Sequence, residues 1–120
     1  MNSSKASPSR IAAFANAVRG LRVLFKGQVN ARIHLMACGV VVALGFGLKV
    51  SATEWLALIL AMACVLTAEA LNTALELCVD LASPEWHELA RDAKDVAAAG
   101  VLLASLGAAG VGAVVFLPKF

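Results

Sequence analysis

The sequence predicts an all-α integral membrane protein with an N-terminal amphipathic helix on the membrane surface and three transmembrane helices. Of its 120 residues, 61% are hydrophobic, and the mean hydropathy is +0.84. A soluble domain of this size has too little interior to bury so much apolar surface. The apolar residues also gather in three long segments, which predict spans at about residues 29–48, 53–81 and 90–117.

The chain length predicts one domain, over residues 9–120. Residues 1–8 are polar and are expected to be disordered, with Pro8 as a candidate first residue of a helix. Residues 1–20 have no clean apolar core, so no secretory signal is expected. The net charge of only +2, without a basic run, argues against a nucleic-acid partner.

Residues 9–27 have the periodicity of an amphipathic helix. Arg19, Arg22 and Lys26 fall on one face at about 100° per residue. The adjacent face carries apolar residues at intervals of three and four, namely Ile11, Phe14, Val18, Leu21 and Phe25. This pattern predicts a helix on the membrane surface, with its rings toward the lipid interior and its cations toward lipid phosphates. An ordinary packed helix is the alternative.

The boundaries of the three spans follow from short polar segments. The apolar run at 33–48 is short for a bilayer core of about 30 Å, so the first span is extended to begin near residue 29. Thr53 and Glu54 resemble a cap for the second span. Pro84 cannot continue a helix, so the second helix ends before it. Ser83 is a candidate cap for the third helix, with Pro84 at its first position, and Pro118 ends that helix.

Small residues in the third span indicate close helix packing. Gly100, Ala104, Ala108 and Gly112 recur at steps of four, which lets another helix backbone approach closely. A helix that is merely rich in small residues is the alternative. Because three spans alone make a thin bundle, we expect a homo-oligomer.

The distribution of basic residues predicts the orientation. Six Lys and Arg residues precede the apolar run at 33–48, and Arg91 and Lys94 follow the second span. Only Lys49 and Lys119 lie on the opposite side. By the positive-inside rule, the N-terminus and the 81–92 loop are cytoplasmic.

The second span carries a stripe of polar residues at its cytoplasmic end. Glu69, Asn72, Glu76 and Asp80 fall within a narrow sector of one helical face. Glu69 lies about 21 Å along the helix from Trp55, the expected outer anchor, and therefore still within the bilayer. An ionisable residue at that depth is costly and by default marks function. The alternative, simple solvation at a helix end, suits Asp80 better than Glu69.

A second polar cluster follows at residues 85–95. Lys94 is suited to neutralise phosphate charge, and Trp86 to stack on a base. Carboxylates beside a lysine suit a magnesium–nucleotide complex. Glu69 is then a candidate general base for a lipid hydroxyl presented at its depth. The glycine-rich stretch at 39–47 lacks the Lys-Ser/Thr ending of a P-loop.

The motif "EALNTALELCVD…PEWHELARDAKDVAAAGVLL", with "GLR" at 20–22 and "NARIH" at 30–34, resembles the diacylglycerol kinase/undecaprenol kinase family of small prokaryotic membrane lipid kinases. The resemblance covers about residues 10–117. It implies a homotrimer of three-span subunits in the bacterial cytoplasmic (inner) membrane, with active sites shared between subunits on the cytoplasmic side. It also implies transfer of the ATP γ-phosphoryl group to a lipid hydroxyl, with Mg²⁺.

The resemblance assigns roles to individual residues. It implies catalytic roles for Glu69 as the base and for Asn72, Lys94 and Asp95. It implies nucleotide contacts for Asn16, Glu76, Asp80, Glu85, Trp86, His87, Lys94 and Asp95. It implies lipid or surface contacts for Arg10, Arg22 and Arg32, and metal ligation by Glu76 and the residue at position 28. The family usually has Glu at that position, whereas this chain has Gln28, which predicts weaker metal binding.

Several functions remain open from the sequence. "NARIH" and "LASPEWHELARDAKDVAAAGVLL" resemble the undecaprenol kinase branch more than the diacylglycerol kinase branch. Undecaprenol is therefore the expected substrate, and diacylglycerol is the alternative. A weakly active homologue and a non-enzymatic ion conduit are further alternatives. A conduit needs polar groups at every depth, whereas residues 55–68 contain only Thr67 and the third span beyond Asp95 only Ser105.

Overall fold

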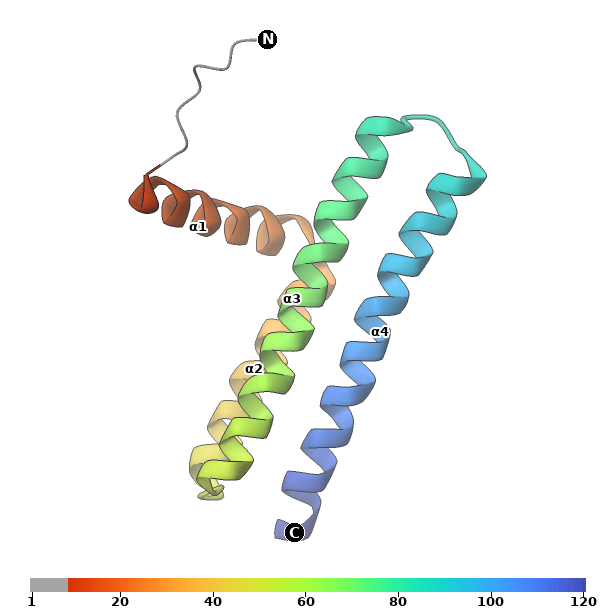
Figure 1. Ribbon diagram of the computed structural model, residues 1–120. Coiled ribbons are helices and arrows are strands. Elements are labelled where there is room, and N and C mark those ends of the chain that lie inside the picture. Colours follow the sequence, from red (N-terminus) through yellow and green to blue (C-terminus); the bar gives the residue numbers. More distant parts are fainter. Residues whose placement is uncertain (1–8) are drawn as a thin grey trace.

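The computed structural model describes residues 9–120. The disorder expected for residues 1–8 and the helix start expected at Pro8 lie outside this range. The described residues form α1 (Arg10–Gly27), α2 (Val29–Gly47), α3 (Ala52–Ala82), α4 (Glu88–Phe116) and a 3-10 turn, η1 (Leu117–Lys119) (Figure 1). Each helix begins and ends within two residues of the range expected from the sequence.

Local hydrogen bonds explain where the helices begin. The Ser9 hydroxyl caps α1 by accepting from the Ala12 amide at 3.2 Å. Ser51, and not Thr53, caps α3: its hydroxyl accepts from the Glu54 amide at 3.1 Å. The Glu54 carboxylate in turn accepts from the Ser51 amide at 2.9 Å, which completes a capping box.

The start of α4 differs from the expectation. Ser83 follows the last residue of α3, and its hydroxyl donates to the carbonyl of Glu85 at 2.8 Å. It is therefore occupied within the loop, and Pro84 is not the first residue of a helix. His87 caps α4 instead, because its Nδ1 accepts from the Leu89 amide at 3.0 Å.

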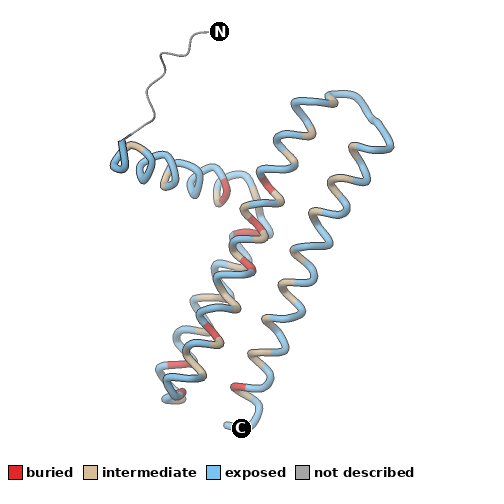
Figure 2. The backbone as a smooth tube through the Cα atoms, in the orientation of Figure 1, coloured by how far each residue is buried: buried red, intermediate tan, exposed pale blue. Residues whose placement is uncertain are grey.

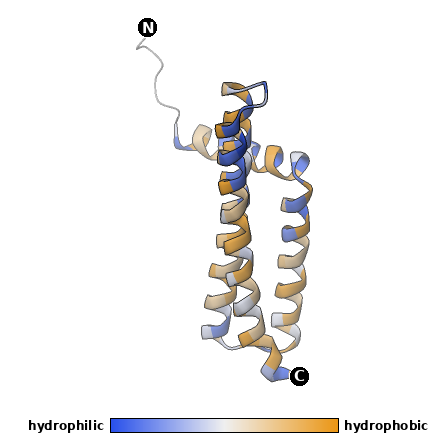
Figure 3. Ribbon diagram, turned by 90° about the vertical axis from the view of Figure 1, so that its right-hand side faces the viewer, coloured by the Kyte–Doolittle hydropathy of each residue, from blue (hydrophilic) through white to orange (hydrophobic). Residues whose placement is uncertain are grey.

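Three helical segments are long and apolar enough to cross a membrane: Val29–Gly47, Ala52–Ala82 and Glu88–Lys119. The mean hydropathy of their most apolar windows is 1.6, 1.8 and 2.2. At about 1.5 Å per residue, α3 is roughly 46 Å long, whereas the bilayer core is about 30 Å thick. One end of α3 must therefore project beyond the apolar core. Figure 3 shows hydrophilic residues gathered where α3 and α4 meet their connecting loop.

The helices form a slender bundle centred on α3, which packs against both α4 and α2. α1 leaves the bundle sideways (Figure 1). The principal-axis extents of 59 × 39 × 21 Å describe this elongated shape. Most residues are exposed when the chain stands alone (Figure 2).

The hydrophobic core is small and lies at the end of the bundle opposite the α3–α4 loop. Val50, Leu58 and Val115 are buried there, and Trp55 packs against them. Gly45 is buried under the ring of Trp55, so that a Cβ at this position would collide with the indole. Side-chain packing fills the space between the helices at this end of the bundle, which is called the closed end below.

Candidate active site

The polar stripe on α3 runs from a buried end to an exposed end. Glu69 is 2% exposed, and Asn72 and Glu76 are partly buried. The side chain of Asp80, at the loop end, is 63% exposed. Thr73 is buried beside the stripe. Among the described residues, Asn72 Oδ1 and Thr73 Oγ1 are the buried side-chain atoms without a hydrogen-bond partner.

At the buried end, Glu69 meets polar side chains from the other two spanning helices. His34 on α2 places Nδ1 2.7 Å from Glu69 Oε1. Its Nε2 lies 3.3 Å from the hydroxyl of Ser105 on α4. The same hydroxyl donates to the carbonyl of Val101 at 2.8 Å. Three helices thus each contribute one polar side chain at one level.

In the middle of the stripe, Gln28 contacts Glu76. Gln28 is the residue between α1 and α2, with extended backbone angles (φ −124°, ψ 113°). Its amide nitrogen donates to Glu76 Oε2 at 3.2 Å. The change of direction between α1 and α2 therefore brings the two expected metal ligands together.

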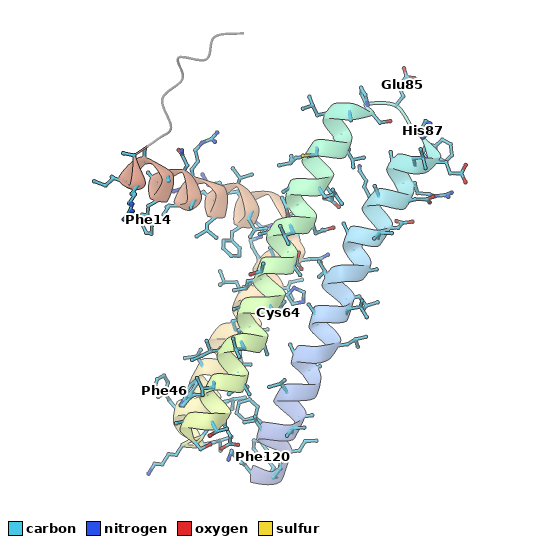
Figure 4. The ribbon with its side chains drawn as sticks, viewed as in Figure 1. Phe14, Phe46, Cys64, Glu85, His87 and Phe120 are labelled. Carbon is cyan, nitrogen blue, oxygen red and sulfur yellow. The ribbon has the colours of Figure 1, made fainter. Side chains whose placement is uncertain are left out.

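At the exposed end, a lysine bridges α4 and α3. Lys94 Nζ lies 2.6 Å from Asp80 Oδ1. A cavity of about 300 Å³ opens beside this pair and the loop. Its lining includes Asp80, Glu85, Trp86, His87, Lys94 and Asp95. Arg91 also lines this cavity, and it pairs with Asp92 at 3.0 Å. Figure 4 shows Glu85 and His87 at this end of the bundle and Phe46 and Phe120 at the other.

The single chain does not bring every expected site residue to this cavity. Asn16 lies on α1, is exposed and is not part of the cavity lining. Arg10, Arg22 and Arg32 are also exposed and form no ion pair with the described part of the chain. Their expected nucleotide and lipid contacts stay predictions.

The geometry suits a reaction at a boundary between apolar and polar surroundings, with a buried carboxylate at one end and a charged cavity at the other. The sequence model of the family described as prokaryotic diacylglycerol kinase matches residues 15–116. The chain belongs to this family of lipid kinases. The suspected family is thereby confirmed, and this kinase is a membrane protein with three helices able to span the bilayer.

Individual relatives of the kinase are named for two activities. It is 35% identical over 106 residues to the undecaprenol kinase of Bacillus subtilis, covering 88% of this chain and 86% of the relative. It is 38% identical over 118 residues to the diacylglycerol kinase of Synechocystis, covering 98% and 67% respectively. It is 35% identical over 86 residues to the diacylglycerol kinase of Escherichia coli K12, covering 72% and 70%.

The donor set at positions 28 and 76 is compatible with Mg²⁺. The described residues contain no cluster of three or more His, Cys, Asp or Glu side chains arranged around one point. Mg²⁺ commonly takes one or two carboxylates and completes its shell with water and phosphate oxygens. Glu76 would supply the carboxylate. The Gln28 amide lies against it through its nitrogen, so the Gln28 oxygen would join it as a ligand once the amide group turns over.

Sequence reasoning missed the partners of Glu69. In the sequence, His34 stands only as part of the motif "NARIH", and Ser105 only as an isolated polar residue in an apolar span. Both are polar residues inside candidate spans, where polar side chains tend to face other helices. That signal was available, but it does not say which polar groups meet.

Proposed function

We propose that this lipid kinase transfers the γ-phosphoryl group of ATP to the hydroxyl of undecaprenol. The relative named undecaprenol kinase aligns over most of both chains, which supports this substrate. Diacylglycerol is the second candidate, because relatives named diacylglycerol kinase share comparable identity. The observation that carries the mechanism is the burial gradient along α3, from Glu69 to Asp80.

Glu69 is the proposed base. A membrane lipid presents its hydroxyl near the boundary of the apolar core, and Glu69 is the buried carboxylate of the described residues. Its role is to orient the hydroxyl and accept its proton as phosphoryl transfer proceeds. Asn72 Oδ1 lies within the buried stripe without a partner and is suited to help orient the same hydroxyl.

The charged cavity is the proposed nucleotide site. Lys94 holds the phosphates and neutralises their charge, with Asp80 as its partner before ATP binds. Asp95, Glu85, Trp86 and His87 contact the nucleotide from the cavity wall. Asn16 of α1 is assigned to nucleotide contact as well. In-line transfer then depends mainly on positioning and charge neutralisation.

Gln28 and Glu76 are the proposed protein ligands of Mg²⁺. When bound, the ion neutralises charge on the triphosphate. The position of Glu76 supports this role, because it lies seven residues from Glu69 and four from Asp80 on one helix. Glu76 is thus between the proposed base and the proposed nucleotide site.

We place the kinase in the bacterial cytoplasmic (inner) membrane, with α1 on the cytoplasmic surface. Arg10, Arg22 and Arg32 are exposed and free to meet lipid phosphates. A homotrimer with shared sites would cover the exposed apolar surface. The small core of the single chain supports this assembly, because only 11%, 22% and 11% of the most apolar windows of the three spans are buried when the chain stands alone.

Phosphate transfer from labelled ATP to purified lipids in detergent micelles tests the proposal. Undecaprenol and diacylglycerol are compared as acceptors, with wild-type protein, Glu69→Gln and Glu76→Gln. Both substitutions should lower the rate by about 10²- to 10⁴-fold. Glu54→Gln, at the other end of the same helix, is the control and should transfer phosphate normally. Equal labelling by all variants would reject the mechanism, and preference for diacylglycerol would reject the substrate.

A further inference from the structure

The contacts of Ser105 determine the hydrogen-bonding state of His34. A serine hydroxyl has one hydrogen to donate, and a carbonyl oxygen can only accept. Ser105 uses that hydrogen on the Val101 carbonyl, 2.8 Å away. Toward His34 Nε2, at 3.3 Å, its oxygen can then only accept. The nitrogen Nε2 of His34 therefore carries a hydrogen.

This assignment fixes what His34 and Glu69 can share. With Nε2 protonated, His34 Nδ1 and Glu69 Oε1 hold one proton between them across 2.7 Å. The pair is either an imidazolium with a carboxylate or a neutral imidazole with a carboxylic acid. Both forms have no net charge. Glu69, at 2% exposure, is therefore buried without an uncompensated charge, which would otherwise be strongly unfavourable.

The pair also leaves one carboxylate oxygen available. His34 contacts Oε1, and within residues 9–120 no hydrogen bond engages Glu69 Oε2. A base held at one oxygen keeps the other oriented toward its substrate, as an aspartate orients the histidine of a catalytic triad. In this kinase the order is reversed, since the histidine orients the carboxylate.

We propose that His34 is a positioning residue for Glu69, held in turn by Ser105. His34 fixes Oε1 so that Oε2 faces the lipid hydroxyl. This inference rests on the proposed role of Glu69. According to this inference, catalysis requires one polar side chain from α2, His34, and one from α4, Ser105, in addition to Glu69 itself.

Matched substitutions of His34 test which of its atoms matters. The side-chain nitrogen of Asn occupies the region of Nδ1, whereas that of Gln reaches toward Nε2. His34→Leu should lower kcat about 10- to 100-fold, with the KM for ATP unchanged because the nucleotide cavity is remote. His34→Asn should recover a large part of kcat, and His34→Gln much less. Ser105→Ala should have a smaller effect in the same direction.

Chemical rescue gives a readout that a purely structural residue would not show. His34 and Ser105 line an apolar cavity of about 300 Å³ between α2, α3 and α4. His34→Ala would enlarge that cavity beside Glu69. Added imidazole should therefore raise the kcat of His34→Ala and leave wild type and Glu69→Gln unaffected.

The outcomes separate this inference from the proposed function. If Glu69→Gln loses transfer while His34→Leu keeps the wild-type kcat, the positioning role is wrong and the base assignment stands. If Glu69→Gln keeps full activity, the base assignment itself fails. An equal loss in His34→Leu and His34→Asn, without imidazole rescue, also overturns the positioning role, provided both variants elute from detergent size-exclusion columns like wild type.

Discussion

The two ends of the bundle each contain an acidic residue of α3 paired with a lysine near or on α4, yet they differ in what surrounds the pair. At the closed end, Lys119 Nζ lies 3.2 Å from Glu54 Oε1. That carboxylate also accepts the Ser51 amide in the capping box, and its side chain is only 28% exposed. At the loop end, the Lys94–Asp80 pair adjoins an open cavity.

The two charge pairs differ in what else their carboxylates and lysines contact. The Glu54 carboxylate accepts hydrogen bonds from the Ser51 amide of the helix cap and from Lys119, and it lies beside a packed core. Asp80 caps no helix end, and its lysine faces a cavity that other polar groups also line. Lys94 therefore lies beside a cavity in which a bound ligand would reach it, whereas the Glu54–Lys119 pair lies beside packed apolar side chains.

The sharpest test of this comparison replaces the two lysines in parallel. Lys94→Met should lower phosphate transfer by about 10²- to 10³-fold, because the charge that neutralises the phosphates is lost. Lys119→Met should leave the rate unchanged. The measurement is initial-rate transfer from labelled ATP to undecaprenol. Equal losses in both variants would show that the two pairs do not differ in function.

Packing at the closed end should control stability but not catalysis. Gly45→Ala introduces a Cβ that collides with the Trp55 ring, and overpacking of this kind costs about 1–3 kcal/mol. We expect a lower melting temperature in detergent with unchanged kcat for the folded fraction. Gly47→Ala, two residues along α2, meets nothing within 4 Å and is the matched control. An unchanged melting temperature for Gly45→Ala would contradict the packing argument.

The capping box should have a smaller effect of the same kind. Ser51→Ala removes the hydroxyl that accepts the Glu54 amide, and loss of such a cap costs about 1 kcal/mol. Thr53→Ala is the control, because Ser51 and not Thr53 caps α3. Thermal unfolding in detergent compares the two variants. A larger loss for Thr53→Ala would restore the assignment made from the sequence.

The sequence predicted those features that depend on one helix at a time. Glu69, Asn72 and Glu76 share a stripe because helical periodicity alone puts them there, and hydropathy alone marks the three spans. The meeting of His34, Glu69 and Ser105 depends instead on how α2 and α4 rotate about α3, which no local pattern specifies. The start of α4 was missed for a similar reason. The sequence indicates Ser83 as the cap, whereas the loop turns the Ser83 hydroxyl to the Glu85 carbonyl and leaves His87 to cap the helix.

The smallest expected effect concerns the metal, at the midpoint between the two ends of the stripe. Gln28 donates to Glu76 at 3.2 Å, so Gln28→Glu would place two carboxylates in contact. Their repulsion is relieved when a divalent cation binds between them. We therefore expect the Mg²⁺ concentration for half-maximal activity to fall about threefold to tenfold in Gln28→Glu. Gln28→Ala removes the hydrogen bond without adding charge and should not lower that concentration. An unchanged magnesium titration for Gln28→Glu would remove position 28 from the metal site and leave Glu76 as its protein ligand.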